Sequence, residues 1–428
     1  MSDKFLFRAF DGTVYYKPKE YTQNKQADEL INPDAILQTE RMVRWRVENN
    51  KHSTDKSLNF HYSLYTNIYI VNSKKAGKTS NYDLQFKHEF ATLYYDVMKR
   101  YNEATTLIET DTFNSIQGLG LKIKQDWEQK SKSTKTLIIM LSGDTSISEL
   151  LNGSSLKPCI DILTVPFGTA NALFLKLFEF PRGLKLNEDL AVEAREIMLE
   201  VFQKFVQNKL ELFKVPFYTI SNKENKTLFK SILLTTTGFH ATLLKVASSP
   251  EYKKYGVERF RIAASEVISN YKFSNKVKLY NTKGKIYFDG ISSYFGVFGT
   301  GRLERDYDIS PLSTLEERSF LSIKEKDDRD AFVNNIMAGY GSKDDLLKLY
   351  NENESINNEK IDLDEELVIE IKKIYPDSDI SVCVDGYILD LQDISTPEMG
   401  SYIVKIKTEH DSNVQFFKLN NGIFSDKN

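Results

Sequence analysis

Residues 136–153 read TLIIMLSGDTSISELLNG, and residues 161–174 read DILTVPFGTANALF. Each segment begins with a short apolar run and continues into small and polar residues, which predicts a buried strand, a turn and then a helix. Because the carboxyl ends of neighbouring parallel strands lie at one edge of a sheet, helix N-terminal amides gather there and attract anions. The two segments therefore predict an open α/β sheet with a phosphate-binding edge.

The same segments resemble the nucleotide-binding signatures GGDGTxxEVxNG and PxGTxN of the diacylglycerol kinase and sphingosine (long-chain base) kinase superfamily. The matching signature positions are Gly143, Asp144, Glu149, Asn152, Gly153, Pro166, Gly168, Thr169 and Asn171. An ordered pair of motifs at this spacing is more specific than either motif alone. The resemblance implies a fold of class α/β plus β, two-lobed and lipid-kinase-like, with an N-terminal Rossmann-like α/β nucleotide lobe and a C-terminal β-rich lobe.

Weaker matches extend the resemblance, in family order, over roughly residues 65–410. Residues 72–78, NSKKAGK, look like the phosphate loop of the family, with Ser73 in place of its proline. Residues 237–241 and 252–260 resemble the GFxAD and YRRLGxxRF segments of sphingosine-kinase-like members. Near the end of the chain, residues 384–386 resemble the VDG of the family's VDGE motif.

The resemblance also implies roles for individual residues. Asp144 corresponds to the family's essential aspartate, as a base or as the organiser of a metal-bound water, and Asp385 lies with it in the Mg²⁺ network. ATP and Mg²⁺ are the implied cofactors. The implied cofactor-binding residues are Asn72, Lys74, Gly77, Lys78, Ser142, Gly143, Thr145, Ser146, Glu149, Gly168, Thr169, Asn171, Lys253, Arg259, Asp385 and Gly386.

These residue types suit phosphoryl transfer to a hydroxyl. That chemistry needs backbone amides close to the phosphates, cations, Mg²⁺ on a carboxylate and a base near the acceptor oxygen. Gly143 and Gly168 lack a Cβ atom and so let the backbone approach a ligand closely. No ordinary Walker loop, GxxxxGK[ST], occurs in the sequence.

Each assignment has a structural alternative. Asp144 also suits the N-cap of the helix that follows it. Lys253 and Arg259 suit a solvated helix face, and Asp385-Gly386 suits a hairpin turn. Glu149 fits an orienting hydrogen-bonding role better than a catalytic one.

Three departures from the family pattern bear on activity. Thr145 replaces a glycine, and a β-branched residue is poorly suited to a positive-φ turn. Thr242 replaces the aspartate that binds the substrate amine in sphingosine-kinase-like proteins, which favours a neutral acceptor over a sphingoid base. Tyr387 replaces a glutamate on the nucleotide side.

Two function classes remain open. The first is an ATP-dependent lipid kinase that phosphorylates a primary hydroxyl of diacylglycerol, ceramide or a long-chain base. The second is a catalytically impaired homologue that acts as a lipid-binding or protein-interaction module. NAD kinases share the fold, but the PFGTAN segment and the second-lobe matches make them the minor case.

Composition agrees with this interpretation. A chain of 428 residues that is 41% hydrophobic can bury a substantial core divided between two lobes. No apolar run reaches the roughly 18–20 residues that span a bilayer, and the N-terminus lacks a signal-peptide core. We therefore expect a soluble, cytoplasmic protein with at most peripheral membrane contact and two free thiols, Cys159 and Cys383. The net charge of −3 argues against a nucleic-acid partner.

The sequence predicts three segments: an N-terminal extension at 1–62, the nucleotide lobe at 63–186 and the lipid-binding lobe at 187–428. The extension is expected to contain short strands and partial disorder at 17–35. In the nucleotide lobe, apolar runs and periodicity predict strands at 67–71, 105–108, 137–141 and 162–165 that alternate with helices, followed by a helix at 191–206. After it, short strands are expected at 217–220, 228–236, 277–280, 285–288, 294–297, 367–374, 381–391 and 402–407. The polar stretch 341–365 predicts an exposed loop.

Overall fold

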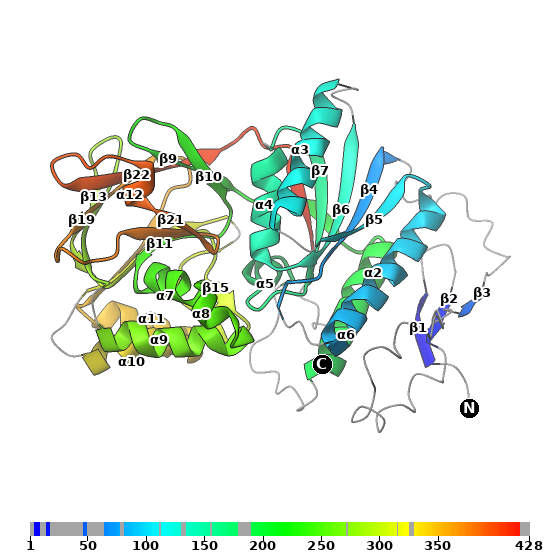
Figure 1. Ribbon diagram of the computed structural model, residues 1–428, viewed down its shortest axis with the longest axis horizontal. Helices are drawn as coiled ribbons and strands as arrows, with labels where there is room; N and C mark the ends of the chain where they lie inside the picture. Colours follow the sequence, from blue (N-terminus) through cyan, green and yellow to red (C-terminus); the bar gives the residue numbers. More distant parts are fainter. Residues whose placement is uncertain are drawn as a thin grey trace.

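The computed structural model describes residues 4–8, 14–17, 46–48, 64–77, 81–110, 113–129, 134–154, 156–178, 190–270, 273–314, 316–324 and 329–419. Within these ranges the fold is mixed α/β, with one largely parallel sheet and two six-stranded antiparallel sheets. Figure 1 shows the parallel sheet and its helices to the right and the antiparallel sheets to the left. The predicted combination of α/β and β structure is confirmed at this level. Lys78 and most of the stretch 17–35 lie outside the described residues.

The parallel sheet contains the strands of both quoted segments and has the order β5-β4-β6-β7-β23-β8. Strands β4 (Asn67–Ser73), β5 (Thr105–Thr110), β6 (Lys135–Ser142) and β7 (Cys159–Pro166) are mutually parallel, as predicted. The helices of this part are α2 (Asn81–Tyr101), α3 (Phe113–Gln129), α4 (Asp144–Ser154), α5 (Ala172–Phe178) and α6 (Leu190–Val206). Because helices cover both faces of the parallel sheet, its inner strands β4, β6 and β7 are buried almost throughout, which explains the continuous apolar run in β6.

Two short strands from later in the chain complete this sheet. β23 (Val414–Lys418) runs parallel to β7, and β8 (Glu211–Phe213) pairs with β23 in the antiparallel sense. Both strands belong to the predicted segment 187–428, although they complete the sheet formed mainly by segment 63–186. The predicted boundary between the two segments therefore does not separate the parallel sheet from the antiparallel sheets at these two strands. Apolar periodicity indicates that a strand is buried but does not identify its pairing partner.

The two antiparallel sheets pack face to face. One has the order β10-β9-β22-β19-β12-β13, and the other has the order β18-β17-β14-β11-β20-β21. A single hydrophobic cluster between them contains Val277 and Ile369 of the first sheet and Phe295 and Val382 of the second. The strands of the first sheet are β9 (Phe217–Asn222), β10 (Thr227–Ser231), β12 (Asn275–Asn281), β13 (Ile286–Ser292), β19 (Leu367–Lys373) and β22 (Ser401–Glu409). Those of the second are β11 (Leu234–Gly238), β14 (Tyr294–Phe298), β17 (Arg318–Ile323), β18 (Ile356–Ile361), β20 (Ser381–Val384) and β21 (Tyr387–Asp390).

Helices cover the other face of the second antiparallel sheet. Phe239, Val267, Phe332 and Leu346 of these helices share a hydrophobic cluster with Cys383 of β20. Both faces of this sheet are therefore buried. The helices in this region are α7 (Phe239–Ala247), α8 (Pro250–Lys253), α9 (Arg259–Asn270), α10 (Arg329–Met337), α11 (Lys343–Glu352) and α12 (Leu391–Ile394).

Two sequence-based predictions need correction here. The stretch 341–365 is not a single exposed loop, because it contains α11 and β18. Ser342 caps α11, and the buried Leu346 and Tyr350 form its narrow apolar stripe. Because most of the surrounding residues are charged or polar, the composition of this stretch suggests a loop. The predicted strand 228–236 is two strands, β10 and β11, which break at residues 232–233 and enter different sheets.

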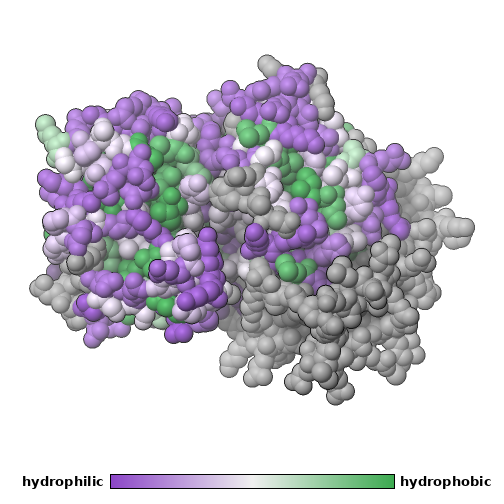
Figure 2. All heavy atoms as spheres, in the orientation of Figure 1, coloured by the Kyte–Doolittle hydropathy of each residue, from purple (hydrophilic) through white to green (hydrophobic). Residues whose placement is uncertain are grey.

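Few large hydrophobic side chains among the described residues are exposed. Figure 2 shows a largely hydrophilic face on which hydrophobic residues gather in small groups. No helix in the described part of the chain combines the length and apolar character needed to cross a membrane. Cys159 and Cys383 are free thiols, as predicted. The N-terminal strands β1 (Lys4–Arg8), β2 (Val14–Lys17) and β3 (Arg46–Glu48) form a small sheet of their own, in the segment where the sequence predicts short strands.

Candidate functional site

Three glycine-bearing loops meet at the carboxyl ends of β4, β6 and β7. A Cβ atom on Gly168 would lie 2.5 Å from the Cα atom of Gly143. A Cβ atom on Gly77, whose φ is +62°, would lie 2.4 Å from the carbonyl oxygen of Phe167. The glycines are therefore required for loop-to-loop packing, and at Gly143 and Gly168 the free space is filled by the other loop's backbone.

Asn171 closes the last of these loops. Its φ is +58°, its side-chain oxygen accepts a hydrogen bond from the Gly168 amide, and its side-chain nitrogen donates to the Gly168 carbonyl, both at 2.8 Å. Thr169, between these two residues, is exposed at the edge of the sheet. Asn171 thus shapes the turn, and Thr169 is the residue of this loop that is accessible to a ligand.

Charged groups hold the first loop in place. Lys74 forms an ion pair with Glu109 at 2.9 Å, and Glu109 also accepts a hydrogen bond from the Asn72 side chain at 3.3 Å. The buried Lys87 of α2 donates to the carbonyl oxygens of Lys74, at 3.3 Å, and of Ala76. The predicted phosphate loop is therefore ordered by contacts to β5 and α2.

Asp144 caps a helix, but a different one from the helix that the sequence predicts. It is the first residue of α4, and its two carboxylate oxygens accept hydrogen bonds from the amides of Ala172, at 2.7 Å, and Leu173, at 3.0 Å, at the start of α5. Burial raises the pKa of Asp144 to about 6, the two amides act in the opposite direction, and the charge of Asp385 adds to the increase. Asp144 is therefore mainly ionised at pH 7.

Asp385 lies in the tight turn between β20 and β21. Asp385 and Gly386 have φ values of +49° and +86°, as a two-residue hairpin turn requires. One carboxylate oxygen accepts from the Ser231 hydroxyl and the amides of Leu233 and Leu234, at 2.8–2.9 Å. The other accepts from the Ile232 amide at 2.7 Å and the Ser148 hydroxyl at 3.0 Å.

These contacts occupy the Asp385 carboxylate completely. A carboxylate offers about four lone-pair positions, and five donors already point at this one. Burial raises the pKa of Asp385, and the amides of the 232–234 turn oppose that increase. Asp385 therefore joins α4 to the break between β10 and β11.

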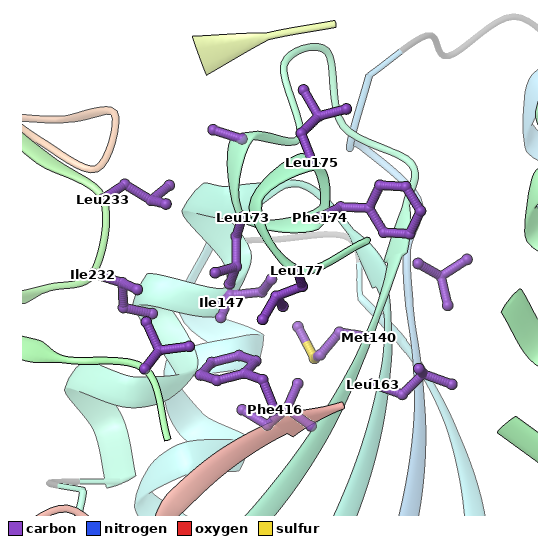
Figure 3. Close-up of a cluster of buried hydrophobic side chains, with 14 of the residues drawn as sticks. Met140, Ile147, Leu163, Leu173, Phe174, Leu175, Leu177, Ile232, Leu233 and Phe416 are labelled. Carbon is purple, nitrogen blue, oxygen red and sulfur yellow. The ribbon is translucent and has the colours of Figure 1, made fainter. Parts of the chain in front are cut away.

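Further contacts strengthen this junction. Figure 3 shows Ile232 and Leu233 beside Leu173, Ile147 and Phe416, so the side chains of the break pack on the parallel-sheet part while their amides bind Asp385. Asn152 of α4 accepts from the Lys230 amide at 2.8 Å and donates to the Lys230 carbonyl at 3.1 Å. The matched residues Asn152 and Asp385 thus both connect α4 to the antiparallel sheets.

Thr145 lies next to the Asp385 turn. A Cβ atom on Gly386 would be 3.3 Å from the Thr145 hydroxyl oxygen. Thr145 is in the first turn of α4 and is not one of the described residues with positive φ, so the predicted backbone strain is wrong. Helix α4 begins at Asp144, whereas the sequence predicts a turn at this residue. Thr145 therefore has a helical backbone, which threonine adopts without strain.

The other departures lie in two different places. Tyr387 stacks on Phe229 with ring centroids 5.1 Å apart, close to the Asp385 turn. Thr242 is on α7, which follows the opposite end of β11, and it lines a pocket with Asp379. The three departures therefore do not form a single site.

Two of the predicted cofactor-binding residues, Lys253 and Arg259, make no described contact with the three loops at the edge of the parallel sheet. Lys253 is exposed at the end of α8, and Arg259 packs over the Phe260 ring with the guanidinium carbon 4.8 Å from its centroid. Among the described residues, no hydrogen bond or ion pair links either of them to the three loops. The remaining predicted residues, Ser142, Ser146 and Gly386, do lie there: Ser146 approaches Ser73 with a hydroxyl separation of 3.4 Å, and Ser142 ends β6.

Lys176 is a residue that the sequence analysis missed. It belongs to α5 and donates a hydrogen bond to the Gly299 carbonyl. Burial lowers the pKa of Lys176 to about 7, although the nearby Asp385 charge acts in the opposite direction. The only sequence signal is a single lysine within the apolar helix ALFLKLF.

Glu149 is buried on α4 with 7% of its surface exposed, and burial raises its pKa to about 8. Its folded-state pKa lies above the ordinary value of 4.5, so the folded protein binds the extra proton more readily than the unfolded chain does. The stability that this group contributes is fully present below pH 4.5 and is lost as the pH rises to about 8.

We therefore expect Glu149→Gln to stabilise the protein at pH 8 relative to wild type, by about 2 °C or more in melting temperature, with the advantage disappearing towards pH 4.5. Glutamine keeps the size of the side chain and does not titrate. Melting temperatures of both proteins across this pH range test the expectation. A difference that is the same at every pH would show that Glu149 does not titrate as described.

Comparison with solved structures identifies the fold. The chain is similar to a protein described as a "putative diacylglycerol kinase" from Bacillus anthracis str. Sterne, with a TM-score of 0.52, 14% identity, and coverage of 83% of this chain and 96% of that one. A second structure with that description gives a TM-score of 0.50, 14% identity, and coverage of 82% and 97%. No family model and no curated protein matches the sequence. The chain therefore has a fold similar to that of these two proteins, as the motif resemblance predicts.

Proposed function

We propose that the protein is an ATP-dependent lipid kinase that phosphorylates a primary hydroxyl of diacylglycerol, ceramide or a long-chain base. The observation that carries the proposal is the meeting of three loops and Asp144 at the carboxyl edge of the parallel sheet, directly beside the Asp385 turn. Nucleotides bind at such edges, and phosphoryl transfer needs a carboxylate there. In this proposal the parallel sheet forms a Rossmann-like nucleotide lobe, and the antiparallel sheets form the lipid lobe.

The described residues fit the two cofactors to different extents. Lys74, Thr145 and Thr169 are partly or fully exposed at the edge, where phosphates would lie. Each oxygen of Asp144 accepts one amide and keeps a lone pair, so Asp144 can hold Mg²⁺ or its water. Asp385 has no lone pair left, which assigns it to the junction instead. When bound, Mg²⁺ would neutralise phosphate charge.

The choice of lipid does not follow from Thr242. Thr242 lines a pocket with Asp379, which precedes β20, whereas Asp385 follows β20. The four residues of this strand alone separate the two ends by about 10 Å. The structure therefore gives no reason to prefer a neutral acceptor on the basis of Thr242. Peripheral membrane contact and a cytoplasmic location remain parts of the proposal.

The test is a thermal shift with ATP in the presence and absence of Mg²⁺. A ligand that binds only the folded state stabilises it by about 2.7 kcal/mol at one hundred times its Kd. We expect MgATP to raise the melting temperature and a phosphorylated lipid to form when a lipid hydroxyl is added. A folded protein with no shift at millimolar MgATP would contradict the proposal.

A catalytically impaired homologue that binds a lipid or a protein is the second candidate. The observation that favours it is the engagement of both Asp144 oxygens by the α5 amides, which gives this aspartate a structural role independent of any substrate. The two candidates differ in whether the wild-type protein binds MgATP, and Thr145→Gly tests whether the departure at this position impairs that binding.

We expect Thr145→Gly to leave MgATP affinity unchanged and to destabilise the protein by up to about 1 kcal/mol, because glycine weakens a helix and there is no positive φ to relieve. Thr145→Ala is the matched control, since it removes the hydroxyl and keeps Cβ. Calorimetric titration of the three proteins with MgATP decides. No binding by wild type and recovery in the glycine variant would support the impaired homologue.

A further inference from the structure

The first antiparallel sheet has a basic outer face. Its inner face packs on the second antiparallel sheet, which lies between it and helices α7 and α9 (Figure 1). Residues directly opposite each other in antiparallel strands point to the same face, so the strand register identifies the side chains of the outer face. Its lysines are Lys230, Lys276, Lys278, Lys372, Lys405 and Lys407, and its carboxylates are Asp289, Glu370 and Glu409. We call this surface the basic face; it has an excess of positive charge although the whole chain carries a net charge of −3.

The carboxylates are unevenly placed on the basic face. Lys230 and Glu409 form an ion pair at 3.8 Å at one side of the sheet, so the other five lysines share only the two remaining carboxylates. Both of these, on β13 and β19, are directly opposite Lys278 of β12. Most of the negative charge is therefore gathered around one lysine.

Two other lysines of the basic face are directly opposite each other. Lys276 of β12 and Lys372 of β19 form a cross-strand pair, and both side chains are exposed. Like charges at such positions destabilise a sheet. Lys276 reaches only Asp289, at 3.8 Å, and Lys372 has no ion-pair partner among the described residues. The pair is an unfavourable contact that an anionic partner would relieve.

The lysines of β22 are also without a carboxylate partner. Lys407 is exposed and forms no ion pair within the described ranges. Lys405 donates to the Lys223 carbonyl at 2.9 Å and to the Asn225 side-chain oxygen at 2.7 Å, and neither acceptor carries a charge. These two ammonium groups therefore extend the uncompensated charge across the sheet.

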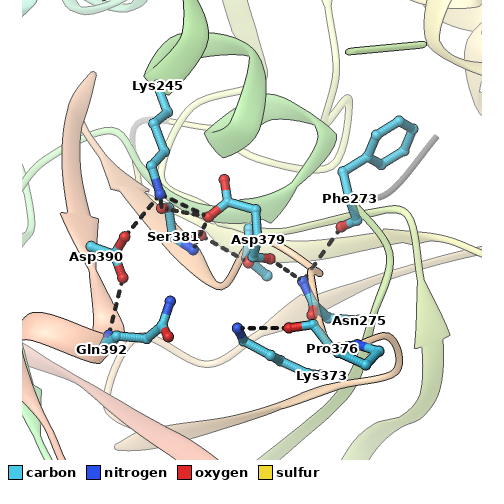
Figure 4. A network of polar contacts seen from close by, with 10 residues as sticks. Lys245, Phe273, Asn275, Lys373, Pro376, Asp379, Ser381, Asp390 and Gln392 are labelled. Carbon is cyan, nitrogen blue, oxygen red and sulfur yellow. Dashed lines mark hydrogen bonds and ion pairs between the residues drawn. The ribbon is translucent and has the colours of Figure 1, made fainter. Parts of the chain in front are cut away.

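Lys245 of α7 shows the compensated arrangement for comparison. It pairs with Asp379 at 3.1 Å and with Asp390 at 2.8 Å, as Figure 4 shows. Its charge is neutralised within the protein, whereas the charges of Lys372 and Lys407 are left for a partner.

Apolar side chains accompany the lysines at the edge of the basic face. Ile286 and Ile291 of β13 are 53% and 44% exposed. Ile291 is directly opposite Lys276, and Ile286 is directly opposite Tyr280, so both isoleucines belong to this face. Lysines beside aliphatic groups suit a membrane interface, where ammonium groups meet anionic head groups and apolar groups enter the acyl boundary. A water-soluble polyanion such as nucleic acid would match the lysines but not the isoleucines.

We propose that the basic face is a docking surface for a membrane that contains anionic phospholipids. The face belongs to a different sheet from the Asp385 turn and from the three loops. The inference deepens the proposed function, on which it rests for the presence of a lipid acceptor in the same membrane.

Co-sedimentation of the whole protein with vesicles, without nucleotide, tests the proposal. We expect binding to phosphatidylcholine vesicles that contain phosphatidylglycerol, and binding weaker by about tenfold or more to phosphatidylcholine alone. Binding to the anionic vesicles should fall as NaCl increases from about 0.05 to about 0.5 M, because salt screens exposed charges. No nucleotide is present, so vesicle binding without lipid phosphorylation would contradict the proposed function alone.

Substitution of the lysines identifies the surface that binds. Lys276→Gln/Lys372→Gln/Lys407→Gln should weaken binding to anionic vesicles by about thirtyfold or more, since each lysine near an anionic surface contributes to binding. The matched control is a triple glutamine variant that removes the same charge from exposed lysines outside the basic face, and it should bind like wild type. Its three positions are Lys157, Lys209 and Lys348.

Ile286→Thr/Ile291→Thr is a second variant that tests the apolar contribution. Threonine is also β-branched and suits a strand, so we expect a folded protein that binds anionic vesicles about threefold or more weakly than wild type. If the triple lysine variant fails to fold, the isoleucine variant decides. Absence of wild-type binding to anionic vesicles, equal binding to neutral vesicles, equal loss in the control or unchanged binding in either face variant would overturn the proposal. Binding of duplex DNA in place of vesicles would overturn it as well.

Discussion

Replacing Asp144 with asparagine is expected to abolish lipid phosphorylation and also to destabilise the protein. The carboxylate accepts the amides of Ala172 and Leu173 through different oxygens, whereas an asparagine side chain offers one oxygen and one NH₂ group. One of the two amides then faces another donor, and an unsatisfied buried amide costs about 1–3 kcal/mol. The variant also loses the negative charge proposed to hold Mg²⁺ or its water.

The control must separate the loss of chemistry from the loss of stability. Asp161, at the start of β7 and 1% exposed, accepts from the Tyr65 hydroxyl at 2.5 Å and pairs with Lys135 at 2.7 Å. Asp161→Asn should therefore destabilise the protein to an extent similar to that of Asp144→Asn. Because Asp161 lies at the start of β7, at the end of that strand away from the three loops, this variant should preserve turnover. Denaturant unfolding and lipid phosphorylation are measured for both variants. Wild-type turnover in Asp144→Asn would remove Asp144 from the mechanism, and an equal loss in Asp161→Asn would attribute the effect to stability alone.

The elements around the site could be predicted from the sequence because their signals are local. The buried strands β6 and β7 follow from the apolar runs 137–141 and 162–165, and the small residues after each strand mark the turns. The order of strand, turn and helix then gives parallel crossovers, and so the edge at which the loops meet. This part of the fold needs no information about distant pairings.

The roles of the acidic residues could not be predicted in the same way. The helix that Asp144 caps starts 28 residues later, so the cap exists only once β6 and β7 are paired. The backbone donors to Asp385 come from residues 232–234 at the break between β10 and β11, a stretch that the sequence predicts as one continuous strand. The contacts of Gly143 with Gly168 likewise depend on two loops that meet only in the folded sheet. In each case the residue type indicates that the residue forms hydrogen bonds or packs closely against another backbone. Which residue it contacts is determined only by the tertiary structure.

Removing the Asp385 carboxylate is expected to give the largest stability loss of any single substitution considered for this chain. Asp385→Ala leaves the Ser148 and Ser231 hydroxyls and the amides of residues 232–234 without their acceptor in a buried junction. Water that enters the space can satisfy part of this demand, and the individual costs are not additive. We expect a loss of about 4 kcal/mol or more, within the range that marks a buried polar network.

Asp390→Asn is the matched control for this prediction. Asp390 ends β21, the strand that follows the Asp385 turn, and its carboxylate pairs with Lys245 at a partly exposed position. Its loss should cost about 1 kcal/mol or less. Urea unfolding of wild type and both variants measures the difference. A cost below about 1 kcal/mol for Asp385→Ala would show that the junction does not depend on this carboxylate.

The milder variant Asp385→Asn separates the structural role of Asp385 from a metal-binding one. Because the five donors leave no lone pair for Mg²⁺, we expect this variant, where it folds, to bind MgATP with the affinity of the wild-type protein while unfolding at lower urea concentration. A direct ligand of the metal would behave in the opposite way, with the Mg²⁺-dependent part of the affinity lost. That result would show that the junction opens when the nucleotide binds, with Asp385 exchanging backbone donors for the metal.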